Sequence, residues 1–241
     1  MLLSHKKNFV FVHIFKTAGT SVTKVFRPHA RWIDRVAHGR GRVKSLIKAG
    51  NRLAGLQHNG MRHITGFHKF ATARQVRQKM GAEAFDRMFS FAFVRNPFDW
   101  VVSVYFHLKR LEDHPHHKMA LDLPFPEFLE AMLRTHPKRQ SDWILGEDGL
   151  PLVRHVGKME NLNQELTTIC EKLSIPFEAA PHENASPGRK KDFRDYYDSH
   201  SRSLVEMYFQ RDLVTFGYAF DQTQTPARPQ EEAPMAMKAC G

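Results

Sequence analysis

The stretch FVFVHIFKTAGTSVTKVF, residues 9–26, decides the fold class. It opens with a continuous apolar run, Phe9 to Ile14, which contains one histidine. A short break follows at Phe15 to Gly19, and apolar residues then recur at helical spacing from Thr20 to Phe26. Short runs rich in Val, Ile and Phe that alternate with helices are typical of strands in a buried parallel sheet. We therefore predict a strand, a turn and a helix, the first unit of an α/β domain.

The turn in this unit has the composition of an anion-binding site. A helix N-terminus offers unpaired N–H groups and the positive end of the helix dipole, so it is suited to phosphate or sulfate. The glycine lets the backbone approach an anion, the lysine adds a positive charge, and the hydroxyl side chains add donors. The residues expected to contact the anion are Lys16, Thr17, Ala18, Gly19, Thr20 and Ser21. The alternative is a plain strand–helix turn with an exposed lysine.

A second segment, FAFVRNP at residues 91–97, has the same character. Phe89 to Val94 reads as a strand, and Asn96 with the following proline predicts the start of a helix. Arg95 then lies at the end of a strand, where ligands of open α/β sheets collect, and its guanidinium can grip a phosphate with two hydrogen bonds. Ser103 follows two helical turns after Asn96 and can donate to the same phosphate. The alternative is a surface ion pair for the arginine and a core-facing serine.

The remaining chain continues the alternation of strands and helices. We predict helices at 72–80, 125–135, 161–173 and 199–216, strands at 63–67 and 153–159, and loops at 113–126 and 181–191. Asn161 with Gln164 has the pattern of a capping box at the start of the third of these helices. The fold expected is one α/β domain, residues 1–221, with a central, mainly parallel sheet flanked by helices. Residues 222–241, rich in Pro, Gln, Ala and Glu, are expected to be a disordered tail.

Charge indicates an anionic ligand. The formal net charge is +11, and residues 27–62 hold nine Lys or Arg against one acid, hence eight of the eleven net charges. Such a surface attracts nucleotide phosphates, acidic glycans, acidic lipids or nucleic acid. The stretch 27–62 matches no motif and is either a wall of a binding site or a solvated face.

Several classes of site and location are disfavoured by the composition. The two cysteines, Cys170 and Cys240, predict neither a disulfide framework nor a zinc site, and the histidines lack metal-binding spacing. No apolar run reaches the length of a membrane span, and the N-terminal apolar run is not followed by a cleavage site. We expect a cytoplasmic protein without a metal site or a membrane span.

Together the two anion-binding segments resemble a known family. FVHIFKTAGTS looks like the 5′-phosphosulfate loop of sulfotransferases that use 3′-phosphoadenosine-5′-phosphosulfate (PAPS), and FAFVRNPFDWVVSVY looks like their 3′-phosphate motif. VGKMENL, PHENAS and DLVTFGYAF extend the likeness over roughly residues 8–220. The branch most similar is that of the carbohydrate sulfotransferases, which includes the heparan sulfate 2-O-sulfotransferases and soluble bacterial members. Phe15 stands where this family usually has proline.

The resemblance implies a P-loop-like sulfotransferase fold and in-line transfer of a sulfuryl group from PAPS to a hydroxyl, with a carbohydrate as acceptor. Lys16 would stabilise the leaving oxygen, and His68 would accept the proton of the hydroxyl, with His63 or a carboxylate as alternatives. The loop after PHENAS closes over the nucleotide in this family. The residues that it would contribute are Asn184, Ser186, Arg189 and Lys190.

Two other function classes remain open at this stage. A P-loop kinase-like phosphotransferase would also need a phosphate loop, but Lys16 precedes the glycine instead of following it, and no Mg²⁺ ligands are evident. A nucleotide- or nucleic-acid-binding basic protein would explain the charge, yet no binding motif is present, and Trp32 is the one stacking aromatic in the basic stretch. No nucleic-acid partner is therefore expected.

Overall fold

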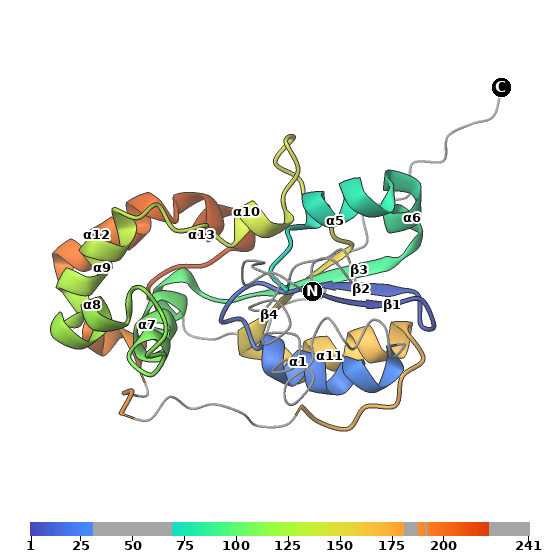
Figure 1. Ribbon diagram of the computed structural model, residues 1–241, viewed down its shortest axis with the longest axis horizontal. Coiled ribbons are helices and arrows are strands. Elements are labelled where there is room, and N and C mark those ends of the chain that lie inside the picture. The colour runs from blue at the N-terminus through green and yellow to red at the C-terminus, as the bar shows by residue number, and fades with distance from the viewer. Residues whose placement is uncertain (31–68, 181–187, 191, 222–241) are drawn as a thin grey trace, which may run out of the picture.

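Four strands form one mixed sheet in the order β1–β2–β3–β4 (Figure 1). The computed structural model describes residues 1–30, 69–180, 188–190 and 192–221. The strand β2 (Phe9–Val12) pairs in parallel with β3 (Phe89–Val94), which pairs in parallel with β4 (His155–Lys158). The strand β1 (Leu2–Ser4) adds an antiparallel edge. The predicted α/β class with a mainly parallel sheet is confirmed.

The two central strands are buried on both faces, and their residues divide between the faces with a period of two. Phe9 and Phe11 of β2 lie with Phe91 and Phe93 of β3 in one core cluster. The smaller residues between them, among them Val10 of β2, belong to a separate cluster. Alternation of this kind follows from the pleat of a strand, in which successive side chains point to opposite faces. It explains why the sequence shows continuous apolar runs here.

Helices cover both faces of the sheet. In Figure 1, α1 and α11 lie on one side, and α5 and α6 lie on the other. The described helices of the chain are α1 (Gly19–Phe26), α5 (Ala73–Met80), α6 (Ala82–Arg87), α7 (Pro97–Leu108), α8 (His117–Asp122), α9 (Phe125–Leu133), α10 (Ser141–Ile144), α11 (Leu162–Lys172), α12 (Ser199–Tyr208) and α13 (Gln210–Phe216). Short 3₁₀ turns occur at Arg27–His29, Met159–Asn161 and Phe193–Tyr196.

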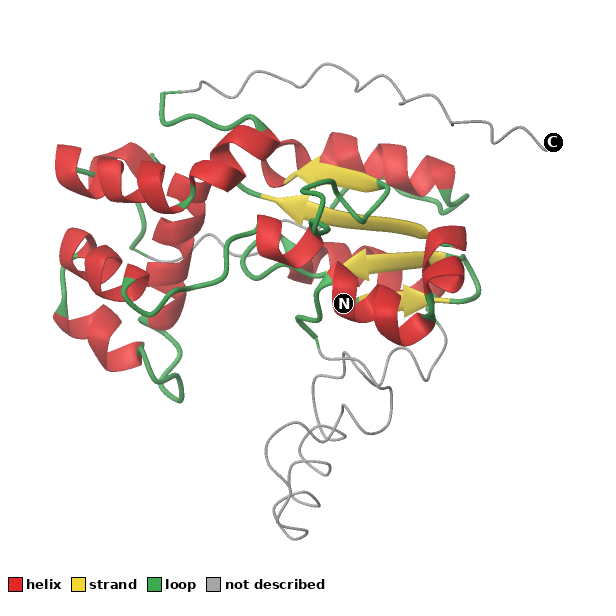
Figure 2. Cartoon of the chain, turned by 90° about the horizontal axis from the view of Figure 1, so that it is seen from above, coloured by secondary structure: helices red, strands yellow, loops and turns green. Residues whose placement is uncertain are grey.

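A second group of helices, formed by α7, α8, α9, α12 and α13, lies beyond the carboxyl ends of the parallel strands (Figure 2). Its core is a separate cluster that includes Phe98 and Trp100 of α7, Phe128 of α9, and Phe209 between α12 and α13. The helix α7 starts directly after β3, with Asn96 capping the Phe98 amide at 3.1 Å and Pro97 in the first turn, as the sequence predicts. It therefore joins the sheet to this helical group.

Three local expectations are wrong. The helix expected at 199–216 is two helices, because Phe209 leaves the helical conformation where its fully buried ring packs against Trp100. The loop expected at 113–126 contains α8, which buries Ala120 in the core of the second helical group. Asn161 does not cap α11 with its side chain, because a 3₁₀ turn leads directly into that helix.

Other expectations are confirmed or fall outside the described residues. Phe89–Val94 is a strand as predicted, and the helix ending at Gly81 starts with a capping box formed by Thr72 and Gln75. The antiparallel strand β1 and the short helices α6 and α10 were not predicted. The strand expected at 63–67, most of the basic stretch and the tail at 222–241 lie outside the part of the chain that the structure describes.

Candidate active site

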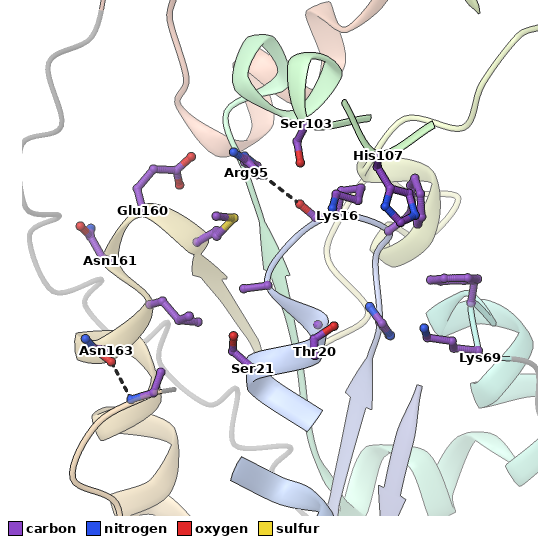
Figure 3. A pocket seen from close by; sticks show the side chains of 18 of the residues that line it. Lys16, Thr20, Ser21, Lys69, Arg95, Ser103, His107, Glu160, Asn161 and Asn163 are labelled. Carbon is purple, nitrogen blue, oxygen red and sulfur yellow. Dashed lines mark hydrogen bonds between the residues drawn. The ribbon is translucent and has the colours of Figure 1, made fainter. Parts of the chain in front are cut away.

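A cavity of about 650 Å³ opens where β2 and β3 end (Figure 3). Its walls come from the loop between β2 and α1, the first turn of α1, the end of β3, one face of α7 and the segment that follows β4. The residues predicted from the sequence that line it are Lys16, Ala18, Gly19, Thr20, Ser21, Arg95, Ser103 and Arg189. The two anion-binding segments therefore meet in one site.

The loop that carries Lys16 has an unusual backbone. Lys16 and Ala18 adopt left-handed conformations, with φ of 62° and 56°, which are uncommon for residues other than glycine. The hydroxyl of Thr17 donates to the carbonyl of Ile14 at 3.0 Å, and the indole of Trp100 donates to the carbonyl of Phe15 at 2.6 Å. Strained backbone of this kind persists only where surrounding structure holds it, and it clusters at functional sites. Thr17 thus holds the loop in shape and does not line the cavity.

The start of α1 presents a helix N-terminus to the cavity. Its N-cap residue, Ala18, makes no side-chain cap, and the first three helical residues all line the cavity. A helix N-terminus without such a cap is suited to bind an anion. Gly19 is required for a further reason: a Cβ atom there would lie 1.8 Å from Nε2 of the buried His13.

Arg95 joins the two segments. Its side chain is buried, and its Nη1 donates to the Lys16 carbonyl at 3.4 Å (dashed in Figure 3). One oxygen of Asp99 accepts from the Arg95 Nε at 2.6 Å, and the other pairs with Arg189. Burial lowers the pKa of the Arg95 guanidinium, and the nearby Asp99 opposes that change. Since two arginines share one carboxylate, this end of the cavity has a surplus of positive charge.

The pKa of Lys16 is changed by this surplus of positive charge. The pKa of its ammonium group is lowered from 10.5 to about 8, chiefly by burial and then by the charges of Arg95, Arg110 and Arg189. An anion in the cavity would reverse these electrostatic contributions and raise the pKa again. The site is therefore electrostatically prepared for a negatively charged ligand.

The helix α7 places two side chains in the cavity on one face. Ser103 is buried, and His107 follows four residues later, which is about one helical turn. The ring of His107 is half-buried and lies edge-on to Phe15, with centroids 5.4 Å apart. Burial lowers the pKa of His107 to about 4, and Lys16 adds the next largest contribution. Sequence reasoning missed His107, although its spacing from Ser103 would have placed it on the same face.

The wall after β4 is polar. One carboxylate oxygen of Glu160 accepts from the Asn96 amide at 2.8 Å, and the other accepts from the Tyr218 hydroxyl at 2.9 Å. Asn163 accepts from the Ala180 amide at 2.9 Å (Figure 3). Both side chains also line the cavity. They tie three chain segments together around it.

The other predicted residues have different outcomes. Lys190 is exposed and does not line the cavity; its Nζ lies 4.0 Å from Asp195. His68, the expected base, and its alternative His63 lie outside the described residues, as do Asn184 and Ser186. Arg189 points into the cavity region, and its buried Nε has no hydrogen-bond partner among the residues described.

Neither a metal site nor a membrane-spanning helix is found in the described part of the chain. Among residues 1–30, 69–180, 188–190 and 192–221, no group of three or more His, Cys, Asp or Glu is arranged to hold a metal ion. No helix in these ranges is long and apolar enough to cross a membrane.

Comparison with known proteins gives one extensive match. The family model described as "Sulfotransferase family" matches residues 1–219. A protein of Archaeoglobus fulgidus, described as uncharacterized, is 27% identical over 117 residues, which are 44% of this chain and 84% of that protein. No solved structure matches the chain.

Proposed function

Because the chain belongs to the sulfotransferase family, we propose that it moves a sulfuryl group from PAPS to a hydroxyl of a carbohydrate. One observation carries the proposal: Lys16 and Arg95, from two segments 79 residues apart, line one cavity and are joined by a hydrogen bond of 3.4 Å. PAPS carries negative charge at both its 5′ and 3′ positions, so a donor site needs two cationic segments side by side.

Each part of PAPS has a proposed partner. The 5′-phosphosulfate binds the loop at Lys16 and the N-terminus of α1, where the first-turn residues line the cavity. The 3′-phosphate binds Arg95 and Ser103, and Arg189, which shares the Asp99 carboxylate with Arg95, lines the same cavity. Charge-assisted hydrogen bonds between guanidinium and phosphate are about twice as strong as neutral ones, which suits a site that must retain a highly charged donor.

Transfer proceeds in line, without a covalent enzyme intermediate. As the bond between sulfur and the bridging oxygen breaks, negative charge grows on that oxygen. Lys16 is proposed to lie against it, because a fixed positive charge that meets developing charge lowers the barrier. The leaving group is 3′,5′-ADP.

The carbohydrate acceptor is proposed from the likeness to the carbohydrate branch of the family, and the cavity is compatible with it. Phe15 and Phe70 line the end of the cavity near Lys16, with ring centroids 5.7 Å apart. The basic stretch 27–62 is proposed to favour an anionic glycan, although its residues beyond Ala30 lie outside those that the structure describes.

Calorimetry with 3′,5′-ADP and 5′-AMP tests the donor site. We expect 3′,5′-ADP to bind about 10- to 100-fold more tightly, since a hydrogen bond to a charged group contributes about 1.5–3 kcal/mol. Binding should be unchanged by EDTA. Equal affinities for the two nucleotides would remove the 3′-phosphate role of Arg95 and Ser103. Hydrolysis of ATP that depends on Mg²⁺ would instead favour a kinase-like phosphotransferase.

A further inference from the structure

The end of the cavity near Lys16 differs in composition from the rest. It is bordered by three aromatic rings, those of Phe15, Phe70 and His107, which line the cavity together. Phe15 packs edge-on against both of the others, with centroids 5.7 Å from Phe70 and 5.4 Å from His107. In Figure 3, Lys16 lies between Arg95 and Ser103 on one side and His107 on the other. The pKa shifts agree with this arrangement, because the charge of Arg95 lowers the pKa of Lys16 and the charge of Lys16 lowers the pKa of His107.

Among the described groups that line this cavity, His107 is the one best placed to accept a proton. Within the described part of the chain its ring packs against the Phe15 ring, and neither of its nitrogens takes part in a hydrogen bond. Glu160 already accepts hydrogen bonds at both of its oxygens. Asp99 is paired with two arginines. His13 is buried between the Phe11 ring and Gly19.

We propose that His107 is the catalytic base that takes the proton of the acceptor hydroxyl. This rests on the proposed function, because it needs PAPS as the sulfuryl donor. The acceptor oxygen forms a bond to sulfur while the bond between sulfur and the bridging phosphate oxygen breaks. The proton of the hydroxyl passes to a ring nitrogen of His107, the electron pair of the broken bond stays on 3′,5′-ADP, and His107 later releases the proton to water.

The surroundings of His107 make its basicity depend on the donor. Its pKa is lowered to about 4, chiefly by burial, and the charges of Lys16, Arg110, His114 and Lys69 act in the same direction. These cations face it from the loop after β2, from the end of α7 and the turn beyond it, and from the segment before α5. A bound polyanion beside Lys16 neutralises that field, so the pKa of His107 rises. The part of the shift that comes from neighbouring charges is thereby reduced, so His107 is a stronger base beside a bound polyanion than without one.

The first experiment needs no acceptor. The pKa of His107 is measured by NMR of the histidine rings, with and without 3′,5′-ADP, and His107→Gln assigns the signal. We expect the pKa to rise by at least one unit when the nucleotide binds. An unchanged pKa in the saturated complex would overturn the coupling and, with it, the assignment of His107 as base.

The second experiment measures transfer from ³⁵S-labelled PAPS to desulfated heparan sulfate. Hydrolysis of PAPS, in which water is the acceptor, is measured beside it. His107→Gln should lower kcat by about 10²–10⁴ while 3′,5′-ADP binds as in the wild type, and the fall of kcat at low pH should disappear. His200→Gln, an exposed histidine on α12 that does not line the cavity, is the matched control and should behave as wild type. His68→Gln is tested in parallel.

The outcomes separate the two proposals. Normal kcat and a normal acid limb in His107→Gln, or their loss in His68→Gln alone, would overturn the role of His107 and leave the sulfotransferase proposal intact. Failure of the wild-type protein to bind 3′,5′-ADP would overturn both. Bound nucleotide in His107→Gln also shows that the variant is folded.

Discussion

Two groups of buried and half-buried polar side chains lie near the carboxyl ends of the strands, and they are built in opposite ways. The first, here called the buried network, consists of Gln140, Asp212, Asn96, Glu160 and Tyr218. Its members satisfy one another and the backbone: Gln140 exchanges two hydrogen bonds with the backbone of Arg95, at 2.8 and 2.7 Å. Asp212 accepts from two successive amides, at 2.7 and 2.9 Å. The network anchors the end of β3 to the C-terminal helices.

The second group, here called the cationic site, consists of Lys16, Arg95, Arg189, Ser103 and His107. It contains three cations around one partner carboxylate, that of Asp99. The pKa values of Lys16 and His107 are lowered to about 8 and about 4, because these groups are partly buried and face other positive charges. Among the residues that the structure describes, no carboxylate forms an ion pair with Lys16 or with His107.

The contrast distinguishes polar side chains that stabilise the fold from polar side chains that are available to bind a ligand. Buried polar groups that stabilise a fold are hydrogen-bonded within it, and an unpaired one weakens it. A buried group of like charges is tolerated when a ligand supplies the missing partner, and activity is often gained at the expense of stability. We therefore expect substitutions in the cationic site to reduce turnover and those in the buried network to reduce stability.

Of the three substitutions that test this comparison, Lys16→Ala is expected to have the largest effect. Removal of one group that stabilises developing charge lowers kcat by about 10²–10³, while the affinity for 3′,5′-ADP changes much less. In the wild type, kcat/KM should fall above a pH of about 8, where Lys16 loses its proton, and the variant should lack this alkaline limb. Kinetics with labelled PAPS across pH check both points. A variant with wild-type turnover would place Lys16 outside the reaction.

Asp212→Asn tests the other side of the comparison. The amide of Asn cannot accept from both the Gln140 and Ser141 amides as the carboxylate does, so a buried donor loses its partner. We expect a loss of about 2–4 kcal/mol in the free energy of unfolding, measured by urea denaturation. Asp195→Asn, at the exposed residue of the turn Phe193–Tyr196, is the control and should be neutral. Reduced turnover per folded molecule in Asp212→Asn would contradict the expectation that the buried network acts on stability alone.

The smallest effect is expected for Ser103→Ala. The change removes one hydroxyl donor to the proposed 3′-phosphate, and a hydrogen bond to a charged group contributes at least about 1.5 kcal/mol, so 3′,5′-ADP should bind about 10-fold more weakly. Affinity for 5′-AMP should not change, because that ligand lacks the 3′-phosphate. Calorimetry on both ligands gives the comparison. Equal losses for the two would point to a general distortion of α7.

Much of the fold follows from local patterns in the sequence. The runs at Phe9–Ile14 and Phe89–Val94 predict β2 and β3 because both strands are buried on two faces and therefore have almost no polar interruption. Asn96 and Pro97 predict the start of α7 because capping is a local interaction. The strand β1 was missed because its three residues become a strand only by pairing with β2. The break at Phe209 was missed because it depends on packing against a distant helix.

The candidate site divides in the same way. Lys16 and Arg95 were predicted because each sits at a strand end next to a helix start, and that is visible locally. The shaping role of Thr17 and the position of Lys190 outside the cavity depend on the folded loops. His107 comes close to Lys16 only because α7 packs against the loop after β2, and this tertiary contact is not visible in the local sequence. Tertiary contact, not local propensity, determined these cases.

The contact between His13 and Gly19 has a consequence for the evolutionary history of the loop. A methyl group at position 19 would overlap the His13 ring, at 1.8 Å from Nε2, so the two positions are not independent. A side chain at position 19 therefore requires that the His13 ring move or be replaced by a smaller side chain. The two positions are coupled in this way, so we expect a residue larger than glycine at position 19 to be accompanied by a smaller residue at position 13.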